Sequence, residues 1–385
     1  MGKGLRFFAA LSAVLLIIPA AGAAPLEAGE PVSLASPSAV LAEVSTGTII
    51  FEKNADEKRQ VASITKLMTA LLLLEDIDSG AITLEDQVTV SKAAASAKGS
   101  QALLDGGAVY PLETLLQAAI MASANDAAIA LAEHASGTEQ AFVDRMNARA
   151  AELQMTNTRY VNCTGLPMDG QYTTARDVAA LSCEVGKHPA YHKYASVWID
   201  TLKHPSGRIT DLTNTNRLVR FYEGCDGFKT GSTDEAKFCV SATAEKNGMR
   251  LVAVVLGNPK SQARFDEARA MMDYGFATYR RVVIAREGDL LGQQVQVTRG
   301  SRDTVDTALG GGLSMLLRVG QEKQLAMEVE LPESIQAPVL KGDTLGTVRV
   351  LLDGKVVAKL NCVAAQDVRL PGFLEGFIKI LDTWR

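Results

Sequence analysis

A basic charge excess, metal-ligand spacings and long internal apolar runs are all missing from this 385-residue sequence. Lys and Arg number 39 against 44 Asp and Glu, which gives a net charge of −5 and an isoelectric point near 5.6. A nucleic-acid surface needs clustered basic residues, so we expect no nucleic-acid partner. The five cysteines and four histidines include no Cys-x-x-Cys or other metal-ligand pattern. We therefore expect neither a metal nor another cofactor.

The cysteines leave one question open. Their number is odd, so at least one is unpaired within the chain. Cys225 and Cys239 could bridge neighbouring strands, or they could be buried as free, small apolar residues. The histidines show no catalytic-triad pattern, and we interpret all four as surface or loop residues.

The one long apolar run lies at the N-terminus. Lys3 and Arg6 precede an apolar run at 7–18, and Ala21-Gly22-Ala23 follows Pro19. These are the three regions of a secretory signal peptide, so residues 1–23 are predicted to be removed after Ala23. A membrane-spanning helix would need roughly 20 apolar residues, and this run is shorter. The sequence therefore predicts an exported protein.

The length and the 47% hydrophobic content predict two domains or more. From 30 to 282, helical apolar patterns lie between a hairpin at 40–53 and strands flanking Asn247-Gly248. This order predicts an α/β (α+β) domain in which a helical cluster flanks a sheet. From 283 to 366, short alternating runs at 293–298, 325–331, 346–352 and 355–360 are separated by Gly and Asp-Gly turns, which predicts a small all-β domain.

Residues 370–385 form an amphipathic pattern. A helix starting near Pro371 would place six apolar residues on one side: Phe373, Leu374, Phe377, Ile378, Leu381 and Trp384. It is too short to span a membrane, so it would lie flat on the membrane surface or dock on the β domain. Periodicity alone does not separate these two possibilities.

Ser63-Ile64-Thr65-Lys66 is the first of three short motifs that carry chemistry. If Ser63 opens a helix, Lys66 lies one turn later, within reach of the serine hydroxyl. The apolar run 67–74 predicts that this helix is buried on most sides. Burial, together with a second cation such as Lys229, would lower the pKa of Lys66 and let it accept the serine proton. Taken alone, the motif would fit a helix start with a surface lysine better than an active site.

Ser123-Ala124-Asn125 is the second motif. It follows the apolar stretch 115–121 and precedes the alanine-rich stretch 126–132, which places it on a turn between two helices. A hydroxyl there could relay protons, and the Asn125 amide could hold both the lysine of the first motif and a substrate amide. The alternative is an ordinary serine or asparagine cap of the next helix.

Lys229-Thr230-Gly231 is the third motif. It precedes the hairpin at Asn247-Gly248 and is predicted to lie on an adjoining strand. An exposed strand edge can pair with an extended peptide, Gly231 allows close approach, and Lys229 and Thr230 can bind a terminal carboxylate. The alternative is a surface strand that ends in a turn.

The order of the three motifs is far more specific than any one of them. Together with the segments 162–167, 172–177, 226–231 and 257–259, they resemble the D-alanyl-D-alanine carboxypeptidases, the low-molecular-weight penicillin-binding proteins. The resemblance runs from about Ser38 to the C-terminus. It implies the penicillin-binding/β-lactamase-like transpeptidase fold with an antiparallel sheet, followed by the small all-β domain.

The resemblance also implies roles for these residues. Ser63 would attack the terminal D-Ala-D-Ala bond of a peptidoglycan stem peptide and release D-alanine, after which water would hydrolyse the acyl-enzyme. Penicillins and other β-lactams would acylate the same serine as covalent inhibitors. The other implied roles are general base for Lys66, proton relay for Ser123, substrate binding for Asn125, Lys229, Thr230 and Gly231, and an oxyanion hole from the backbone N–H groups of Ser63 and Ser232.

The family likeness favours membrane association of the 370–385 helix, on the extracytoplasmic face of the bacterial membrane or in the cell wall. Two positions depart from the common pattern: Ala124 replaces a glycine, and Ser232 stands where better-known members carry histidine. Arg217 follows a segment in which some members place an arginine, so it is a candidate carboxylate anchor. The alternatives are a peptidoglycan DD-endopeptidase, a β-lactamase-type hydrolase, and a penicillin-binding protein without turnover that serves as a binding module.

Overall fold

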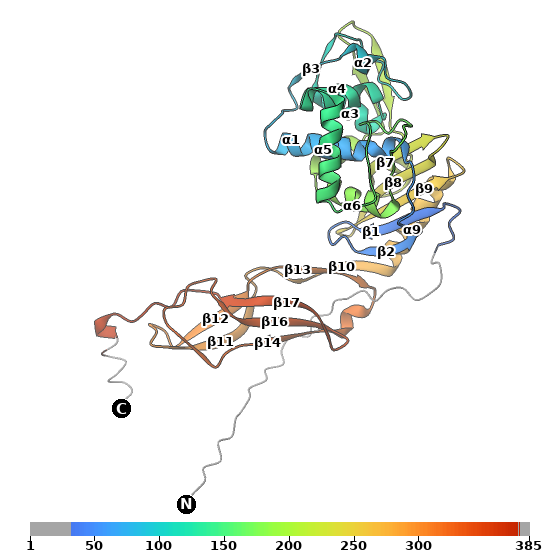
Figure 1. Cartoon of the computed structure of the whole chain (residues 1–385). Coiled ribbons are helices and arrows are strands. Elements are labelled where there is room, and N and C mark those ends of the chain that lie inside the picture. The colour runs from blue at the N-terminus through green and yellow to red at the C-terminus, as the bar shows by residue number, and fades with distance from the viewer. Residues whose placement is uncertain (1–31, 376, 378–385) are drawn as a thin grey trace, which may run out of the picture. The chain divides into compact units, whose positions relative to one another are not determined.

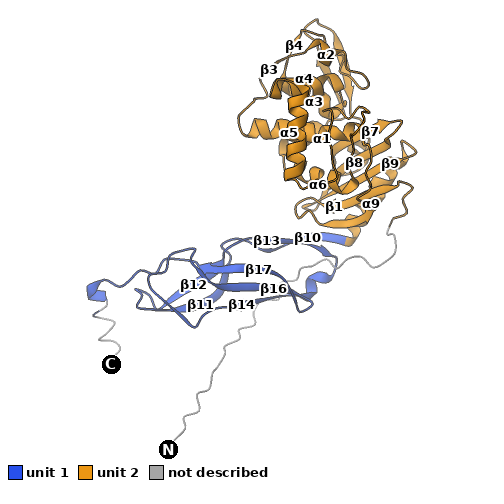
Figure 2. Cartoon of the chain, viewed as in Figure 1, with its two compact units in different colours: residues 1–25, 279–385 blue, residues 26–278 orange. Residues whose placement is uncertain are grey.

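A computed structural model describes residues 32–375 and 377. They fall into two compact units that divide between Thr278 and Tyr279 (Figure 2). The sequence analysis placed this change near residue 283. The predicted signal peptide at 1–23, and residues 376 and 378–385 of the predicted tail helix, lie outside the described residues.

The first unit is built on a five-stranded antiparallel sheet in the order β2-β1-β9-β8-β7 (Figure 1). The strands are β1 Ser38–Glu43, β2 Ile49–Lys53, β7 Cys225–Thr233, β8 Lys237–Lys246 and β9 Met249–Asn258. The predicted β8–β9 turn is confirmed, because Asn247 and Gly248 both adopt the positive φ that a tight hairpin requires. The third motif lies in β7, at the edge of the sheet.

Helices cover both faces of this sheet. Every residue of β1 is buried, so the strand is covered on both faces and does not alternate between buried and exposed positions. Helix α9, Ala263–Thr278, packs so closely on one face that a Cβ at Gly275 would meet Leu41 and Leu251. Val40 and Val252 point the other way and join the core of the helical cluster. The predicted antiparallel sheet with a flanking helical cluster is confirmed.

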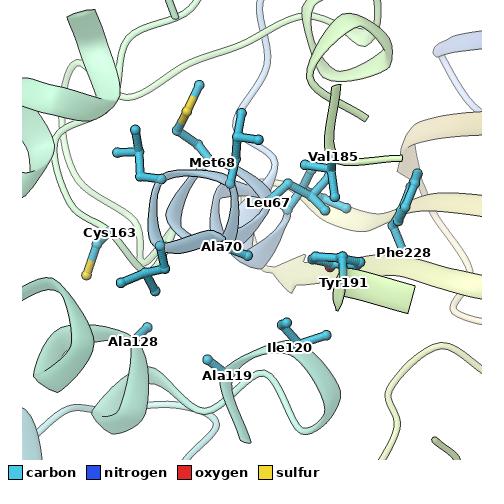
Figure 3. Packing of buried hydrophobic residues seen from close by; sticks show 14 of the residues in the cluster. Leu67, Met68, Ala70, Ala119, Ile120, Ala128, Cys163, Val185, Tyr191 and Phe228 are labelled. Carbon is cyan, nitrogen blue, oxygen red and sulfur yellow. The ribbon is translucent and has the colours of Figure 1, made fainter. Parts of the chain in front are cut away.

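Helix α1, Lys66–Asp78, is the centre of the helical cluster. All its residues from Lys66 to Leu74 are buried, and apolar side chains surround it on every side (Figure 3). A helix in this position needs no polar face, which explains why Thr69 is the one polar residue from 67 to 74, and its hydroxyl donates to the Cys163 carbonyl. The other helices of the unit are η1 Ala62–Thr65, α2 Lys92–Ala95, α3 Leu112–Met121, α4 Asn125–Ser136, α5 Glu139–Glu152, α6 Ala175–Val185, α7 Pro189–Ala195 and α8 Leu218–Phe221.

Two small antiparallel ladders complete the unit. They are formed by β3 Gln87–Thr89 with β4 Val109–Pro111, and by β5 Ile199–Lys203 with β6 Ile209–Thr213. The connection between β5 and β6 carries His204, which is buried and hydrogen-bonded to Tyr110 and Thr210. His204 is therefore a loop residue, as the sequence analysis interpreted it, but its side chain is buried instead of lying at the surface.

From Tyr279 to Ala364 the second unit is all-β apart from one 3-10 turn, as predicted, and the described residues 373–375 and 377 of the tail are helical. Its main sheet has the order β14-β16-β17-β12-β11-β15, and β10 pairs separately with β13. The elements are β10 Tyr279–Ala285, β11 Leu290–Thr298, β12 Thr304–Leu309, β13 Leu313–Arg318, η2 Gln321–Gln324, β14 Leu325–Glu330, β15 Ser334–Gln336, β16 Thr344–Leu352 and β17 Lys355–Ala364.

All five cysteines are buried and free. Cys225 pairs in register with Ala244, whereas Cys239 lies opposite Gly231, so the two cysteines are not cross-strand neighbours. The second of the two possibilities, burial as free apolar residues, is the one found.

Candidate active site

The nucleophile motif lies where the chain enters α1. Ser63 is in the 3-10 turn η1 and Lys66 is the first residue of α1. Side chains three residues apart eclipse one another in a 3-10 turn, which brings them closer than an α-helical turn would. The Lys66 Nζ accordingly lies 3.0 Å from the Ser63 Oγ. The predicted contact is present, although the turn that makes it is 3-10 rather than α.

Two glycines let η1 sit this close to its neighbours. A Cβ at Gly165 would lie 1.9 Å from the Ala62 carbonyl oxygen, and a Cβ at Gly231 would lie 2.1 Å from that of Val61. Neither position can therefore carry a side chain without displacement of the backbone that precedes Ser63. The sequence analysis assigned Gly231 the task of admitting a peptide. In the structure, it admits the chain segment that carries Ser63.

Lys66 is held by three oxygen atoms. Besides Ser63, its Nζ contacts the Asn125 Oδ1 at 2.5 Å and the Thr164 carbonyl oxygen at 2.8 Å. The amide and carbonyl oxygens can only accept hydrogen bonds, whereas the serine hydroxyl can also donate. A neutral amine has two N–H groups and one lone pair. If the N–H groups point at the two fixed acceptors, the lone pair faces the Ser63 hydroxyl.

The two motif lysines are both buried cations. Lys66 is only 2% exposed, and burial lowers its pKa to about 7. Burial also lowers the pKa of Lys229 well below its ordinary value, and the charges of Lys66 and Arg264 lower it further. The repulsion between Lys66 and Lys229 is mutual, so the pair holds one proton more easily than two. This environment matches the expectation that burial lowers the pKa of Lys66, whereas the charges of Cys163 and Asp126 act in the opposite direction.

The second motif occupies the turn between α3 and α4, as predicted. Ser123 is buried and has a φ of 63°, an unusual backbone conformation for a side-chain-bearing residue. The N-cap of α4 is Ala124, which makes no side-chain cap bond, so the helix-cap alternative is wrong. The Asn125 side chain instead spans the site, because its Nδ2 donates to the Lys98 carbonyl at 2.6 Å while its Oδ1 accepts from Lys66.

The third motif lies in the edge strand β7. Lys229 is 1% exposed, and its Nζ donates to the Thr230 carbonyl at 3.3 Å. The Thr230 hydroxyl donates to the Thr215 hydroxyl at 2.7 Å. Ser232 is exposed, immediately after the glycine that contacts η1. The strand therefore presents its motif beside Ser63 through the contact between Gly231 and η1.

Arg217 is not joined to this cluster by a hydrogen bond or ion pair within the described residues. It is exposed at the start of α8, and its guanidinium donates to Gln262 at 3.4 Å. Its position gives no direct support to the carboxylate-anchor interpretation.

Several supporting residues escaped the sequence analysis. Asn162 accepts hydrogen bonds from the N–H groups of Thr164 and Gly165, and so fixes the loop whose Thr164 carbonyl holds Lys66. The Asp126 carboxylate binds the N–H groups of Ala102 and Leu104. The segment 162–167 was noticed only through the family likeness. No local pattern identifies Thr164, because its contact with Lys66 uses a backbone carbonyl.

Comparisons with known proteins agree with this geometry. A family model described as D-alanyl-D-alanine carboxypeptidase matches residues 25–260, and one described as penicillin-binding protein 5, C-terminal domain, matches residues 279–369. The chain belongs to the D-alanyl-D-alanine carboxypeptidase family. It is 36% identical to the D-alanyl-D-alanine carboxypeptidase DacF of Bacillus subtilis, and the match covers 90% of this chain and 89% of that protein.

Two further relatives cover both units. The D-alanyl-D-alanine carboxypeptidase DacC of Escherichia coli is 32% identical over 96% of this chain and 93% of its own length. Penicillin-binding protein 5 of Haemophilus influenzae is a structural neighbour with a TM-score of 0.76 and 28% identity, over 89% of this chain and all of that one.

Family membership confirms the main sequence prediction. The chain is a serine-type carboxypeptidase of peptidoglycan metabolism, and penicillin binding is a property of this group. The family acts on the cell wall, outside the cytoplasm. No helix among residues 32–375 and 377 is long and apolar enough to cross a membrane.

Proposed function

We propose that this chain removes the terminal D-alanine from peptidoglycan stem pentapeptides through an acyl-enzyme on Ser63. One observation carries the proposal: the buried Lys66 side chain contacts both the Ser63 hydroxyl and the Asn125 amide of the second motif. With a pKa of about 7, roughly half of the Lys66 side chains are neutral near pH 7 and can act as a base.

In the first half-reaction, one proton moves from Ser63 to Lys66 and then from Lys66 to the leaving group. Neutral Lys66 accepts the Ser63 proton as the Oγ attacks the carbonyl carbon of the penultimate D-alanine. The backbone N–H groups of Ser63 and Ser232 bind the oxyanion that forms. Lys66 then returns the proton through the Ser123 hydroxyl to the leaving nitrogen, the peptide C–N bond breaks, and D-alanine departs.

The second half-reaction uses water. Lys66 takes a proton from a water molecule that attacks the ester carbonyl, the Ser63 C–O bond breaks, and the proton passes to the serine oxygen. A β-lactam follows the same first half-reaction, except that its amine remains attached to the acyl group and cannot diffuse away. The same constellation therefore explains covalent inhibition by penicillins.

The order of groups along β7 orients the substrate. Lys229 and Thr230 would bind the terminal carboxylate, and Ser232 would bind the scissile carbonyl. An extended peptide advances about 3.3 Å per residue along a strand, so its upstream residues lie beyond Ser232. A pocket of about 620 Å³ opens there and is lined by Pro167, Ser232, Thr233, Asp234, Glu235, Lys237, Phe238 and Pro259. It offers room for the upstream part of the stem peptide.

The direct test is D-alanine release from a stem pentapeptide ending in D-Ala-D-Ala. We expect release by the wild type and none by Ser63→Ala. Ser79→Ala is a matched control, because this exposed serine lies at the far end of the same helix and its hydroxyl donates to the Asp76 carbonyl. Cleavage of cross-linked stem peptides without D-alanine release would instead establish an endopeptidase. Rapid penicillin turnover alone would establish a β-lactamase.

We also propose that the chain is exported by residues 1–23 and held on the extracytoplasmic face of the bacterial cytoplasmic membrane by residues 370–385. Within the described part of that tail, Leu370, Phe373, Leu374 and Phe377 are all exposed, with Phe373 at 92%. Four exposed apolar side chains in eight residues favour a lipid surface over water. Their exposure supports the flat-lying helix over a helix docked on the β domain.

A further inference from the structure

Arg264 is a buried cation without a charged partner. Its side chain enters from α9, the residue is 8% exposed, and it forms no ion pair with any carboxylate in residues 32–375 and 377. Burial lowers its pKa to about 10, although an arginine in water stays protonated far above that pH. Its Nε is buried without a hydrogen-bond partner. Burial of a cation without a counter-charge lowers the stability of the fold. Its presence at this position therefore points to another purpose.

The Arg264 guanidinium is aimed at the catalytic strand. Its Nη1 donates to the Gly231 carbonyl at 2.9 Å and to the Cys239 carbonyl on the neighbouring strand at 3.2 Å. The rings of Phe238 and Phe265 lie 5.4 and 4.6 Å from its central carbon, which fixes the plane of the guanidinium. Arginine therefore bridges β7 and β8 at the glycine of the third motif.

The Gly231 carbonyl belongs to the same peptide unit as the Ser232 N–H. A positive donor on a carbonyl oxygen draws electron density from the peptide nitrogen and makes its N–H a stronger donor. We propose that Arg264 is a positioning residue of the oxyanion hole: it polarises and fixes the Gly231–Ser232 peptide so that the Ser232 N–H stabilises the tetrahedral intermediate. The inference rests on the proposed function, since it needs acylation of Ser63.

Its location explains why a charged group is kept there. A neutral donor could bridge the two carbonyls at a smaller desolvation cost, but it would polarise the peptide less. The substrate never has to touch Arg264, because the effect passes through one peptide bond. The role is thus distinct from that of Lys229 and Thr230, which would contact the substrate directly.

The test compares Arg264→Gln and Arg264→Lys with the wild type in acylation by a chromogenic β-lactam. Loss of a complete oxyanion-hole donor costs about 100- to 1000-fold in rate. Weakening that donor should therefore cost less, and we expect Arg264→Gln to lower the acylation rate constant about 10- to 100-fold. The dissociation constant of the preceding non-covalent complex should stay within about twofold. Arg264→Lys keeps the charge but not the forked guanidinium, so its acylation rate constant should fall between those of the wild type and Arg264→Gln.

A spectroscopic readout separates this role from simple support of the fold. The ester carbonyl of the acyl-enzyme, labelled with ¹³C, should absorb at a higher infrared frequency in both variants, because a weaker donor polarises it less. Arg269→Gln is the matched control: this exposed arginine of the same helix donates to the Phe221 carbonyl of α8 and not to the Gly231 carbonyl. It should leave both the rate and the frequency unchanged.

Each outcome is decisive. An unchanged acylation rate or ester frequency in Arg264→Gln would overturn the inference, as would a slower reaction caused entirely by weaker non-covalent binding. If Arg264→Gln does not fold, wild-type rate and frequency in folded Arg264→Lys would overturn it equally. Absence of acylation in the wild type would refute the proposed function and this inference with it.

Discussion

Replacement of Asn125 by aspartate tests whether the protonation of Lys66 controls the reaction. The Asn125 Oδ1 lies 2.5 Å from the Lys66 Nζ, so Asn125→Asp places a carboxylate against the amine with little change in shape. The negative charge favours the ammonium form and raises the pKa of Lys66 above about 7. Because only the neutral amine can accept the serine proton, the variant should be inactive where the wild type is active.

The magnitude follows from the distance. Two unit charges whose centres lie about 4 Å apart attract by about 4 kcal/mol at an effective dielectric constant of about 20. One pKa unit corresponds to about 1.4 kcal/mol, so the largest displacement is about three units. Aspartate also loses the Asn125 Nδ2 bond to the Lys98 carbonyl, which reduces the precision of the contact. We therefore expect the acidic limb of the pH profile to move upward by about one to three pH units.

The assay is the rate constant for acylation by a β-lactam, measured from about pH 5 to pH 10. For the wild type, the rate should rise as the pH increases through about 7, because Lys66 loses its proton there. For Asn125→Asp, a displacement of about one to three pH units should lower the rate at pH 7 by about fivefold to about 500-fold, and the rate should recover toward pH 10. Asn125→Ala removes the same contact without adding a charge, so its rate should fall at every pH without an upward displacement.

Two results would refute this reasoning. The first is an acidic limb at the same pH in the wild type and in Asn125→Asp, which would mean that Lys66 is not the titrating group. The second is an equal upward displacement in Asn125→Ala, which would trace the effect to lost packing instead of charge.

Three further outcomes are expected. Gly231→Ala should lower the free energy of unfolding by about 1–3 kcal/mol and slow acylation, because its Cβ would lie 2.1 Å from the Val61 carbonyl oxygen. Gly311→Ala, where a Cβ meets nothing within 4 Å, is the control, and equal urea midpoints for the two would contradict the steric argument. Lys229→Met should slow acylation yet raise the free energy of unfolding by about 1–3 kcal/mol at pH 6, because it removes a buried cation. This gain in the free energy of unfolding should shrink as the pH rises from 6 toward about 10.4, where the lysine of the unfolded chain also loses its proton. An equal gain in urea unfolding at pH 6 and near pH 10 would exclude the charge as its cause. Truncation before Pro371 should move the protein from the membrane fraction to the soluble fraction after cell lysis, and continued sedimentation with membranes would disprove the tail's role.

The local features of this chain were predictable because short-range physics sets them. The apolar run after Lys66 could only suit a helix surrounded by other elements, and Asn247-Gly248 could only suit a tight turn. The contact between Ser63 and Lys66 spans three residues, so backbone geometry alone brings the pair together. The order of the three motifs then indicated the family.

The contacts that tune the chemistry come from parts of the chain far apart in sequence. Asn125 and Thr164 reach Lys66 across 59 and 98 residues, and neither distance is encoded in a local period. The burial of the loop residue His204 could not be predicted for the same reason, since burial depends on what packs above a loop.

The sequence by itself therefore determined the contact between Ser63 and Lys66, the turn and strand that carry the other motifs, and the family of the chain. Tertiary structure alone decided that Lys66 is buried and held by the acceptors on Asn125 and Thr164. It also decided that η1 packs directly against Gly231, and that Arg264 binds the carbonyl of that glycine in β7. The physical reason is that desolvation and close packing are properties of the assembled core. A residue's identity fixes which bonds it can make, but only the surrounding chain fixes which of them it does make.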